Sequence, residues 1–239
     1  MSTAHNPIRL YETVVDDCPY LENERSGSIL VDPDHEVDAH LFSLLSRSGF
    51  RRSGDMLYTP KCPNCNACVS VRIPVNDFLP SRSQKRVWKK NNDIKVEIED
   101  VEFKQKHFDL YLKYQRARHP DSSMCDEDPT KYISFITSKY SNSRFLCMYK
   151  NNDLIGVCVI DQFNEGLSAV YTFFDPEVSN LSLGTFIILY MIKIAHLRKI
   201  PYVYLGYWIE NSSKMNYKRN FKPLEGYIDR QWVQLDVKS

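Results

Sequence analysis

The sequence predicts an α+β protein, in which helices and antiparallel strands occupy different stretches of the chain. Three segments in the second half, at residues 144–149, 154–161 and 167–174, have strand-like patterns and follow one another closely. Asn, Asp and Gly fill the short turns between them, and these residues favour hairpins. A strongly apolar helix over residues 182–198 and a further strand over residues 202–209 come next. This order predicts that the helix returns the chain to the same sheet.

Length and composition are those of an ordinary globular protein. The chain has 239 residues, 43% of them hydrophobic, so it can bury a core without staples. Its 31 basic and 30 acidic residues give a net charge of +1, so nucleic-acid affinity has to come from a local patch. The sequence shows no secretory signal and no membrane span, and its seven cysteines favour reduced thiols. We therefore expect a cytoplasmic protein with no membrane partner.

We expect residues 1–100 to form an N-terminal, cysteine-containing α+β domain. Its first helix is predicted to start at Asp38, a suitable N-cap, and to stop at Gly49. The last strand of this part alternates strictly between apolar and polar residues, as a half-buried strand does. In chain order, the expected elements are a helix over 38–48, a turn-rich cysteine knuckle over 62–68, a strand over 69–75, a basic helix over 81–91 and a strand over 94–101.

We expect residues 101–239 to form a second domain with a mixed central sheet. Helices are predicted over residues 104–119 and 130–140, before the three strands. A short helix over residues 212–220 is predicted after the last strand. The order of helices, three-stranded meander, long helix and returning strand resembles an acyltransferase core of the GNAT type.

The cysteine knuckle is a candidate metal site. Cysteines two residues apart can aim both sulfurs at one ion, and a remote fourth cysteine would complete a zinc or iron–sulfur site. The alternative is a structural turn with packed, reduced thiols, since the second cysteine pair of a zinc ribbon is absent. Both interpretations stay open, and in either case we expect the four sulfurs to lie close together. The candidate ligands are Cys18, Cys62, Cys65 and Cys68.

The basic helix is a candidate nucleic-acid site. Its cations recur at helical spacing, so they share one face, while Val87 and Trp88 are expected to face the body of the protein. Such a row suits a phosphate backbone, although a solvated helix face is the common alternative. The cations are Arg82, Lys85, Arg86, Lys89 and Lys90.

Two further segments carry candidate site residues. The strand that contains Tyr171 ends at Asp175, and the helix after it has one glycine, Gly184, near its start. GNAT enzymes that use coenzyme A have several glycines there to hold pyrophosphate, so this sequence argues against coenzyme A as donor. In the next strand, Gly206 indicates a bulge or the close approach of another backbone. Asp175 could equally be a turn residue, and the strand around Gly206 an ordinary buried one.

Together these segments resemble the aminoacyl-tRNA–protein transferases of the N-degron pathway. The resemblance runs from residue 18 to residue 232 and depends on several blocks in one order. These are Cys18-Pro-Tyr-Leu21, Phe50-Arg-Arg-Ser-Gly54, the knuckle, Ser81-Arg-Ser-Gln-Lys-Arg86, Tyr171 to Pro176, Ser182-Leu-Gly-Thr185, Tyr204-Leu-Gly-Tyr207 and Lys214-Met-Asn-Tyr-Lys218. The short chain and the three-cysteine knuckle look like the bacterial leucyltransferase branch. Leu21 stands where eukaryotic arginyltransferases have a second cysteine, which weakens the case for their metal chemistry here.

The resemblance implies transfer of leucine from leucyl-tRNA to proteins that begin with Asp or Glu, which marks them for degradation. Aminoacyl-tRNA is the co-substrate, and no other cofactor is required because aminolysis of an ester forms the amide directly. An arginyl-tRNA donor with the same acceptors and a non-catalytic tRNA-binding protein are the alternatives. The sequence leaves the general base and the oligomeric state open.

Candidate roles follow from a GNAT-like core, in which acyl transfer occurs where two parallel strands part. Asp175 would orient or deprotonate the incoming amine, and N–H groups near Gly206 would meet the oxyanion. An acidic acceptor also needs a nearby cation, and Lys218 is the first candidate. The full predicted site comprises Asp175, Tyr171, Gly206 and Tyr207 for catalysis and Lys214, Asn216, Tyr217 and Lys218 for the acceptor.

Overall fold

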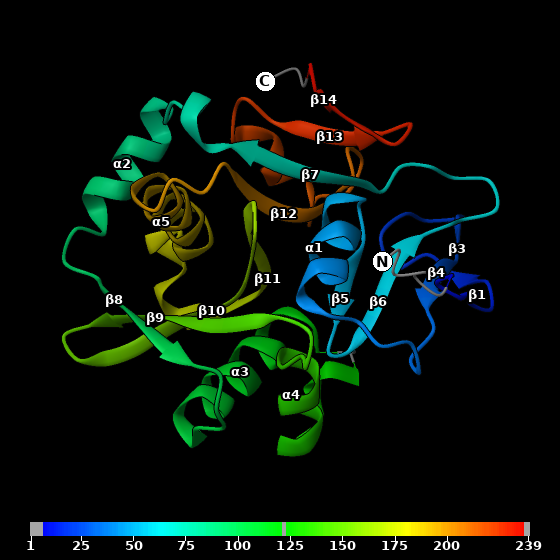
Figure 1. The fold of residues 1–239 in the computed structure, drawn as a ribbon. Helices are drawn as coiled ribbons and strands as arrows, with labels where there is room; N and C mark the ends of the chain where they lie inside the picture. Colours follow the sequence, from blue (N-terminus) through cyan, green and yellow to red (C-terminus); the bar gives the residue numbers. More distant parts are fainter. Residues whose placement is uncertain (1–6, 121–122, 237–239) are drawn as a thin grey trace, which may run out of the picture.

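A mixed eight-stranded sheet runs through the protein (Figure 1). The structure is a computed structural model that describes residues 7–120 and 123–236. The strands are β7 (Val69–Pro74), β8 (Lys95–Asp100), β9 (Asn142–Lys150), β10 (Asp153–Phe163), β11 (Gly166–Phe174), β12 (Tyr202–Trp208), β13 (Glu225–Ile228) and β14 (Gln231–Gln234). Their order is β14-β13-β7-β12-β11-β10-β9-β8. Strands β11 and β12 are parallel and the other neighbours antiparallel, so the predicted mixed α+β architecture is confirmed.

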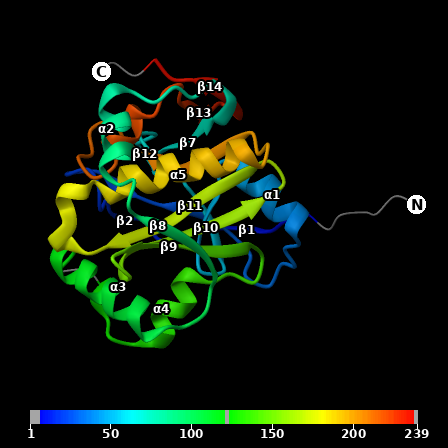
Figure 2. The same cartoon turned by 90° about the vertical axis from the view of Figure 1, so that its left-hand side faces the viewer.

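Helices cover both faces of this sheet (Figure 2). They are α2 (Arg82–Lys90) and α5 (Leu183–Leu197) on one face, and α3 (Gln105–Arg118) and α4 (Pro129–Ile136) on the other. In β10, Val157 and Val159 pack on the α3 side, whereas Cys158 packs on the α5 side. Because successive strand residues point to opposite faces, an apolar central strand contributes to both cores.

A smaller sheet of N-terminal strands lies beside the large one (Figure 1). It comprises β1 (Leu10–Glu12), β4 (Ser28–Val31), β6 (Met56–Pro60) and β5 (Arg51–Ser53), with helix α1 (Ala39–Arg47) and the small hairpin β2 (Asp16–Asp17) and β3 (Arg25–Ser26). Phe42 and Leu45 of α1 share one apolar cluster with Phe163 and Tyr204 of the large sheet. Helix α1 therefore joins the two sheets. The sequence pattern did not predict these strands, because most are too short to show an alternation.

The predicted helix starts depend on local capping and are confirmed. Asp38 accepts a hydrogen bond from the N–H of Leu41 at 2.7 Å, and Ser81 forms a capping box with Gln84. The capped N–H groups would otherwise have no partner in the helix, so the sequence signal here is strong.

Two predicted helices are wrong, one in its end and the other in its start and type. Helix α4 stops at Ile136 rather than residue 140, because Arg52 donates to the carbonyls of Ile136 and Thr137 at 3.0 and 3.2 Å. The helix predicted over 212–220 is a short 3₁₀ helix, η4 (Asn216–Asn220). The other 3₁₀ segments are η1 (Val75–Asp77), η2 (Ser123–Cys125) and η3 (Pro176–Leu181).

The large sheet takes strands from both parts of the chain. β7 lies between β12 and β13, and β8 pairs with β9, although β7 and β8 both precede residue 101. The division into domains at residue 100 stays a prediction. No helix within the described residues combines the length and the apolar character needed to span a membrane.

A buried ion pair connects the small sheet to the large one. The side chain of Arg52 on β5 is 2% exposed and donates to both oxygens of Asp161 on β10, at 2.6 and 2.8 Å. Ser141 and Ser143 donate further bonds to Asp161 Oδ1 at 3.0 and 2.7 Å. Both charges are therefore paired and hydrogen-bonded, which a buried ion pair requires.

We predict that Asp161→Asn lowers the free energy of unfolding by about 3–5 kcal/mol, because it leaves a buried guanidinium without its charge partner. Urea denaturation at pH 7 measures the change. The matched control is Glu165→Gln, which removes the half-exposed pair with Arg47 and should change stability by less than about 1 kcal/mol. Equal effects of the two substitutions would contradict the prediction.

Candidate active site

The two parallel strands of the sheet separate soon after they begin to pair. β11 and β12 pair only at Gly166–Tyr202, Leu167–Val203 and Ser168–Tyr204. Beyond that point, residues 169–172 of β11 are half-buried, although β11 is a central strand. Within residues 7–120 and 123–236, the peptide groups of β12 beyond Tyr204 that face β11 have no strand partner. This is the separation at which the predicted catalytic residues were expected to meet.

Gly206 forms the bulge predicted from the sequence. The β12–β7 register shifts between Tyr204 and Gly206, and Gly206 has φ +78°, a conformation that favours glycine. A Cβ atom at this position would lie 3.3 Å from a guanidinium nitrogen of Arg51. The missing side chain therefore lets Arg51 lie against the backbone of β12.

Arg51 reaches across the space between the parted strands. It comes from β5 of the small sheet, and its Nη2 donates to the carbonyl oxygen of Ala169 on β11 at 2.9 Å. Burial lowers the pKa of this guanidinium, although Tyr207, Tyr58 and Asp161 act in the opposite direction. One cation thus contacts both strands at their point of separation.

Lys218 is a second cation beside this point. Its side chain turns inward from η4, the residue is 5% exposed, and Nζ donates to the carbonyl oxygen of Tyr207. The pKa of Lys218 is lowered to about 7, mainly by burial and also by Arg51, while Cys68 acts in the opposite direction. Within the described residues, neither Lys218 nor Arg51 forms an ion pair with a carboxylate.

The other predicted acceptor residues lie around Lys218 in different settings. Lys214 is exposed and precedes η4, so Lys214 and Lys218 do not lie in one helix as the predicted helix over 212–220 implied. Asn216 has a buried Oδ1 for which no partner occurs in the described part of the chain. Tyr217 is 44% exposed. The 3₁₀ turn brings the Lys218 ammonium to the backbone of β12.

The two predicted catalytic tyrosines lie on opposite strands. The single hydroxyl proton of Tyr207 on β12 is shared between the carbonyls of Gly49 and Tyr58, at 2.9 and 3.2 Å from the oxygen. Tyr171 on β11 accepts a bond from Gln115 Nε2 at 2.7 Å. Burial raises the pKa of both hydroxyls, so both stay neutral and act as fixed polar groups rather than as bases.

Asp175 lies away from Gly206. It is seven residues beyond the last β11–β12 pair, or roughly 23 Å along the strand, whereas Gly206 is two residues beyond that pair. Its carboxylate accepts from the N–H of Glu177 at 3.0 Å and pairs with Lys113 at 2.9 Å. Burial raises its pKa, but Lys113 and the Glu177 N–H outweigh burial and lower it. This geometry favours a cap and an ion pair over a general base.

Helix α2 presents the predicted basic face. All five cations are exposed, whereas Gln84 is buried and Trp88 packs on Phe186 at 5.5 Å between ring centroids. None of the five forms an ion pair with a carboxylate in the described residues. Gln84 Nε2 donates to the carbonyl of Asn220 at 3.0 Å, which attaches α2 to the last residue of η4.

Cys18, Cys62 and Cys65 are near enough to Cys68 to act on its thiol, but no three of these four sulfurs all lie within 4.8 Å of one another. The pKa of Cys68 is raised to about 11, mainly by burial and also by the thiols of Cys62, Cys18 and Cys65, while Lys218 acts in the opposite direction. Among the described residues, the group of metal-type ligands whose atoms all lie within 4.8 Å of one another is instead Glu99, His107 and Cys147. Metal binding by the knuckle therefore stays a hypothesis.

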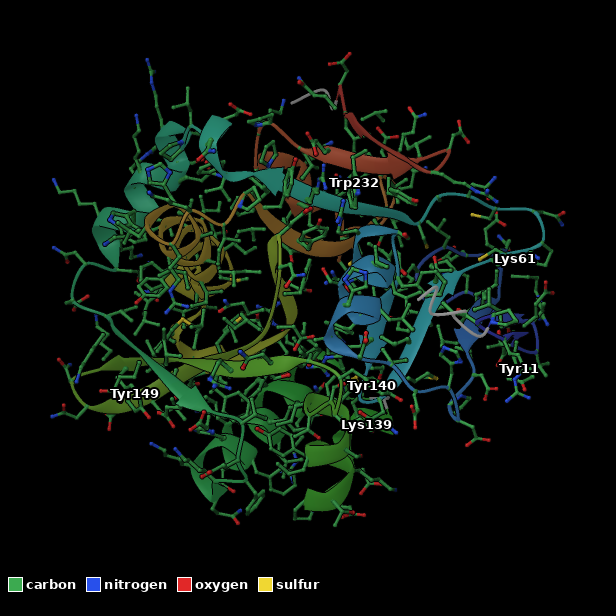
Figure 3. All side chains as sticks on the ribbon, in the orientation of Figure 1. Tyr11, Lys61, Lys139, Tyr140, Tyr149 and Trp232 are labelled. Atoms are coloured by element: carbon green, nitrogen blue, oxygen red, sulfur yellow. The ribbon has the colours of Figure 1, made fainter. Side chains whose placement is uncertain are left out.

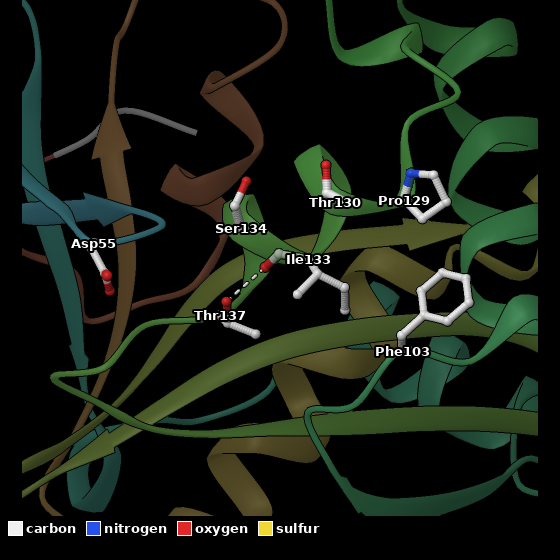
Figure 4. A pocket seen from close by; sticks show the side chains of 7 residues that line it. All are labelled: Asp55, Phe103, Pro129, Thr130, Ile133, Ser134 and Thr137. Atoms are coloured by element: carbon white, nitrogen blue, oxygen red, sulfur yellow. Dashed lines mark hydrogen bonds between the residues drawn. The ribbon is translucent and has the colours of Figure 1, made fainter.

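A separate hollow lies beside α4, with a volume of about 610 Å³ (Figure 4). Phe103, Ile133 and Thr137 line it together with Asp55. Asp55 already accepts a bond from the N–H of Lys139 at 2.8 Å. The hollow does not include any predicted site residue.

Sequence reasoning missed Arg51 as a site residue. The signal was present in Phe50-Arg-Arg-Ser-Gly54, one of the blocks that carried the resemblance, but nothing in the pattern assigned either arginine a place. Trp232 was also part of the resemblance. Its Nε1 donates to the carbonyl of Arg47 at 2.8 Å, which fixes the C-terminal hairpin to α1 (Figure 3).

The protein thus has an α+β core with a mixed sheet. Beside this sheet lie a basic helix and two cations, Arg51 and Lys218, that form no ion pair with a carboxylate in the described residues. Comparisons with known proteins agree with this description. Residues 16–86 match the family model of the N terminus of arginine-tRNA-protein transferase, and residues 106–228 match the model of its C terminus. The chain belongs to the arginine-tRNA-protein transferase family. It is accordingly an enzyme, an aminoacyl-tRNA–protein transferase.

Bacterial relatives named aspartate/glutamate leucyltransferase cover nearly the whole chain. One from Teredinibacter turnerae is 42% identical over 97% of this chain and 96% of its own length. One from Nitrosococcus oceani is 45% identical over 90% and 91%, and one from Pseudomonas fluorescens is 43% identical over 96% and 97%. A solved structure, that of L-PGS from Bacillus licheniformis, is 6% identical with a TM-score of 0.48 and covers 73% of this chain and 52% of that one.

We predict that replacing Lys85 and Arg86 together with Ala weakens tRNA binding and flattens its salt dependence by about one unit of log–log slope per lost contact. Filter binding of tRNA at several salt concentrations measures both. The control is Arg116→Ala with Lys131→Ala, which also removes two exposed charges, each of which is already paired with a carboxylate. An unchanged slope in the α2 variant would refute tRNA binding by this helix.

Proposed function

We propose that this protein transfers leucine from leucyl-tRNA to the α-amino group of proteins that begin with Asp or Glu, and so marks them for degradation in the cytoplasm. The names of the relatives support both the donor and the acceptor. The observation that carries the acceptor half is Lys218, a buried cation beside the Gly206 bulge for which the described residues supply no carboxylate.

The reaction we propose is direct aminolysis of the tRNA ester. The α-amine attacks the carbonyl carbon, the ester C–O bond breaks, and the proton of the amine is finally carried by the tRNA hydroxyl or by water. Model α-amino groups have pKa values of roughly 7.7–8.0, so part of the acceptor is already a nucleophile near neutral pH. The main contribution of the protein is then to position the two substrates, with strand-free N–H groups near Gly206 facing the oxyanion.

The described residues favour a leucyl donor over an arginyl donor. An arginine pocket needs a carboxylate to pair with the substrate guanidinium, whereas a leucine pocket needs apolar walls. The buried carboxylates in the described part of the chain are Asp32 and Asp161, and each is already paired with an arginine, Arg9 or Arg52. Among these residues, no fully buried acid is therefore left to pair with an arginyl group, which favours leucine as the amino acid transferred.

Each predicted site residue keeps a proposed part in this scheme. We assign tRNA binding to the exposed face of α2 and acceptor binding to the η4 region, with Lys218 first. Tyr171 and Tyr207 would form the two sides of the reaction centre as fixed polar groups. Asp175 would act on the incoming amine only if the acceptor chain extends along β11 toward it, because its distance from Gly206 is too large for direct contact.

The deciding experiment supplies leucyl-, arginyl- and phenylalanyl-tRNA in turn, with peptides that begin with Asp, Glu, Lys or Arg. We expect transfer of leucine to the Asp and Glu peptides alone. A preference for arginyl-tRNA would move the protein to arginyl transfer, and a preference for Lys or Arg peptides would overturn the acceptor assignment. Binding of tRNA without any transfer would leave only a tRNA-binding protein.

Lys218 gives a pH-dependent prediction for stability. Its pKa is about 7 in the folded protein and near 10.5 in the unfolded chain, so the unfolded state binds more protons between these values. The wild-type protein should therefore gain stability as pH rises from 7 toward 10. Arg51 on β5 and Cys68 in the knuckle are the titratable or charged groups that act on Lys218.

We predict that Lys218→Met removes this dependence and makes the protein more stable than wild type at pH 6, with the difference shrinking toward pH 10. Thermal unfolding at pH 6, 8 and 10 measures it. The exposed Lys214→Met is the control, since it removes a lysine from the same segment without burying a charge. A constant difference between Lys218→Met and wild type across this range would contradict the shifted pKa.

A further inference from the structure

Two neighbouring arginines on β5 have opposite surroundings. Arg52 is saturated: each of its three guanidinium nitrogens has a partner. These partners are Asp161, Ser143 and the carbonyls of Gly54, Ile136 and Thr137. Arg51 makes a single hydrogen bond within the described residues, from Nη2 to the carbonyl of Ala169. Nε, Nη1 and the second N–H of Nη2 have no partner among these residues, so the guanidinium can still present one adjacent pair of donors.

The charge of Arg51 is not balanced by its surroundings. The carboxylate that acts on it is Asp161, which is already bound through both oxygens to Arg52. Lys218, close enough for its pKa to be lowered by Arg51, adds a second positive group. Unpaired charges at partly buried positions are costly, and a guanidinium cannot lose its proton to relieve this. The arrangement is therefore suited to an anion.

The geometry specifies what kind of anion fits. The Nε–Nη2 edge of the Arg51 guanidinium faces Gly206, where a Cβ atom would lie 3.3 Å from Nη2, 3.5 Å from Nε and 3.7 Å from Cζ. A planar fork of donors matches the two oxygens of a carboxylate. Tyr207 flanks this position, and its hydroxyl is held by Gly49 and Tyr58, so the surroundings are fixed rather than adaptable.

We propose that Arg51 binds the side-chain carboxylate of the N-terminal Asp or Glu of the acceptor and thereby sets the acceptor class. The inference deepens the proposed function and depends on it. Only a short chain of carbons separates this carboxylate from the α-amine, so a carboxylate held at Arg51 places the amine beside the Gly206 bulge. Arg51 is always charged, whereas Lys218 is only partly charged near pH 7, so Arg51 supplies the constant part of the recognition.

A tRNA phosphate is the competing anion. The exposed cations of α2 suit a phosphate backbone, because a polynucleotide can reach them from solvent. Arg51 instead lies half-buried between β11 and β12, next to the fully enclosed Lys218 and to Tyr207. A single small carboxylate fits this position better than a phosphodiester within a chain.

The experiment compares acceptors that differ only in charge. Leucyl-tRNA is supplied with peptides that begin with Asp or Glu and with the matched peptides that begin with Asn or Gln. In Arg51→Gln, we expect kcat/KM for the Asp peptide to fall roughly 10²-fold, as for loss of a buried charge partner, while the Asn peptide changes little. The Asp-to-Asn ratio therefore collapses, and Kd for tRNA stays at the wild-type value.

Two further variants keep the result interpretable. Arg51→Lys retains the positive charge but loses the two-donor edge of the guanidinium. Its Asp-to-Asn ratio should therefore lie between those of wild type and Arg51→Gln. If Arg51→Gln does not fold, Arg51→Lys provides the test. Arg47→Gln, which removes an arginine on α1 that pairs with Glu165 at the surface, should keep the wild-type ratio.

Two outcomes would overturn the inference. An unchanged Asp-to-Asn ratio in the Arg51 variants would mean that Arg51 only holds β11 in place. An equal loss for all peptides, together with weaker tRNA binding, would assign Arg51 to phosphate. If the wild-type protein transfers leucine to no acidic peptide, the proposed function itself is wrong. If the wild-type protein prefers acidic peptides and Arg51→Gln keeps that preference, only the inference about Arg51 is wrong.

Discussion

The ion pair between Arg52 and Asp161 holds the small N-terminal sheet against the large one. Both charges are almost fully removed from solvent, and the guanidinium also closes the end of α4 through the carbonyls of Ile136 and Thr137. Three segments far apart in the sequence thus share one set of hydrogen bonds. Because a buried charge without its partner is so unfavourable, this contact fixes the position of β5 within narrow limits.

That fixed position decides what the neighbouring residue does. Successive side chains on a strand point to opposite faces, so when Arg52 is locked into β10, Arg51 points the other way, to the separation of β11 and β12. The bulge at Gly206 leaves room for it, and η4 brings Lys218 to the same place. Arg52, the structural cation, and Arg51, the proposed functional cation, are thus adjacent in sequence. They differ in whether a carboxylate of the protein pairs with the guanidinium.

The features predicted best from the sequence were those with local causes. N-caps at Asp38 and Ser81, the row of cations on α2 and the bulge at Gly206 each follow from a few residues and their spacing. The N-terminal strands were missed because strands this short have no periodicity of their own and are stabilised by pairing. The end of α4 was misplaced because a residue more than eighty positions away, Arg52, binds its last carbonyls.

By itself, the sequence determined the α+β class, the resemblance to tRNA–protein transferases and most of the residue types that the reaction needs, because helix caps, hairpin turns and ordered motif blocks are short-range signals. The tertiary structure alone decided which of those residues meet. It separates Asp175 from Gly206, turns Lys218 inward while Lys214 stays in solvent, and leaves Arg51 without a carboxylate while Arg52 has one. Burial and charge pairing depend on contacts between distant segments, and no local pattern in the chain records them.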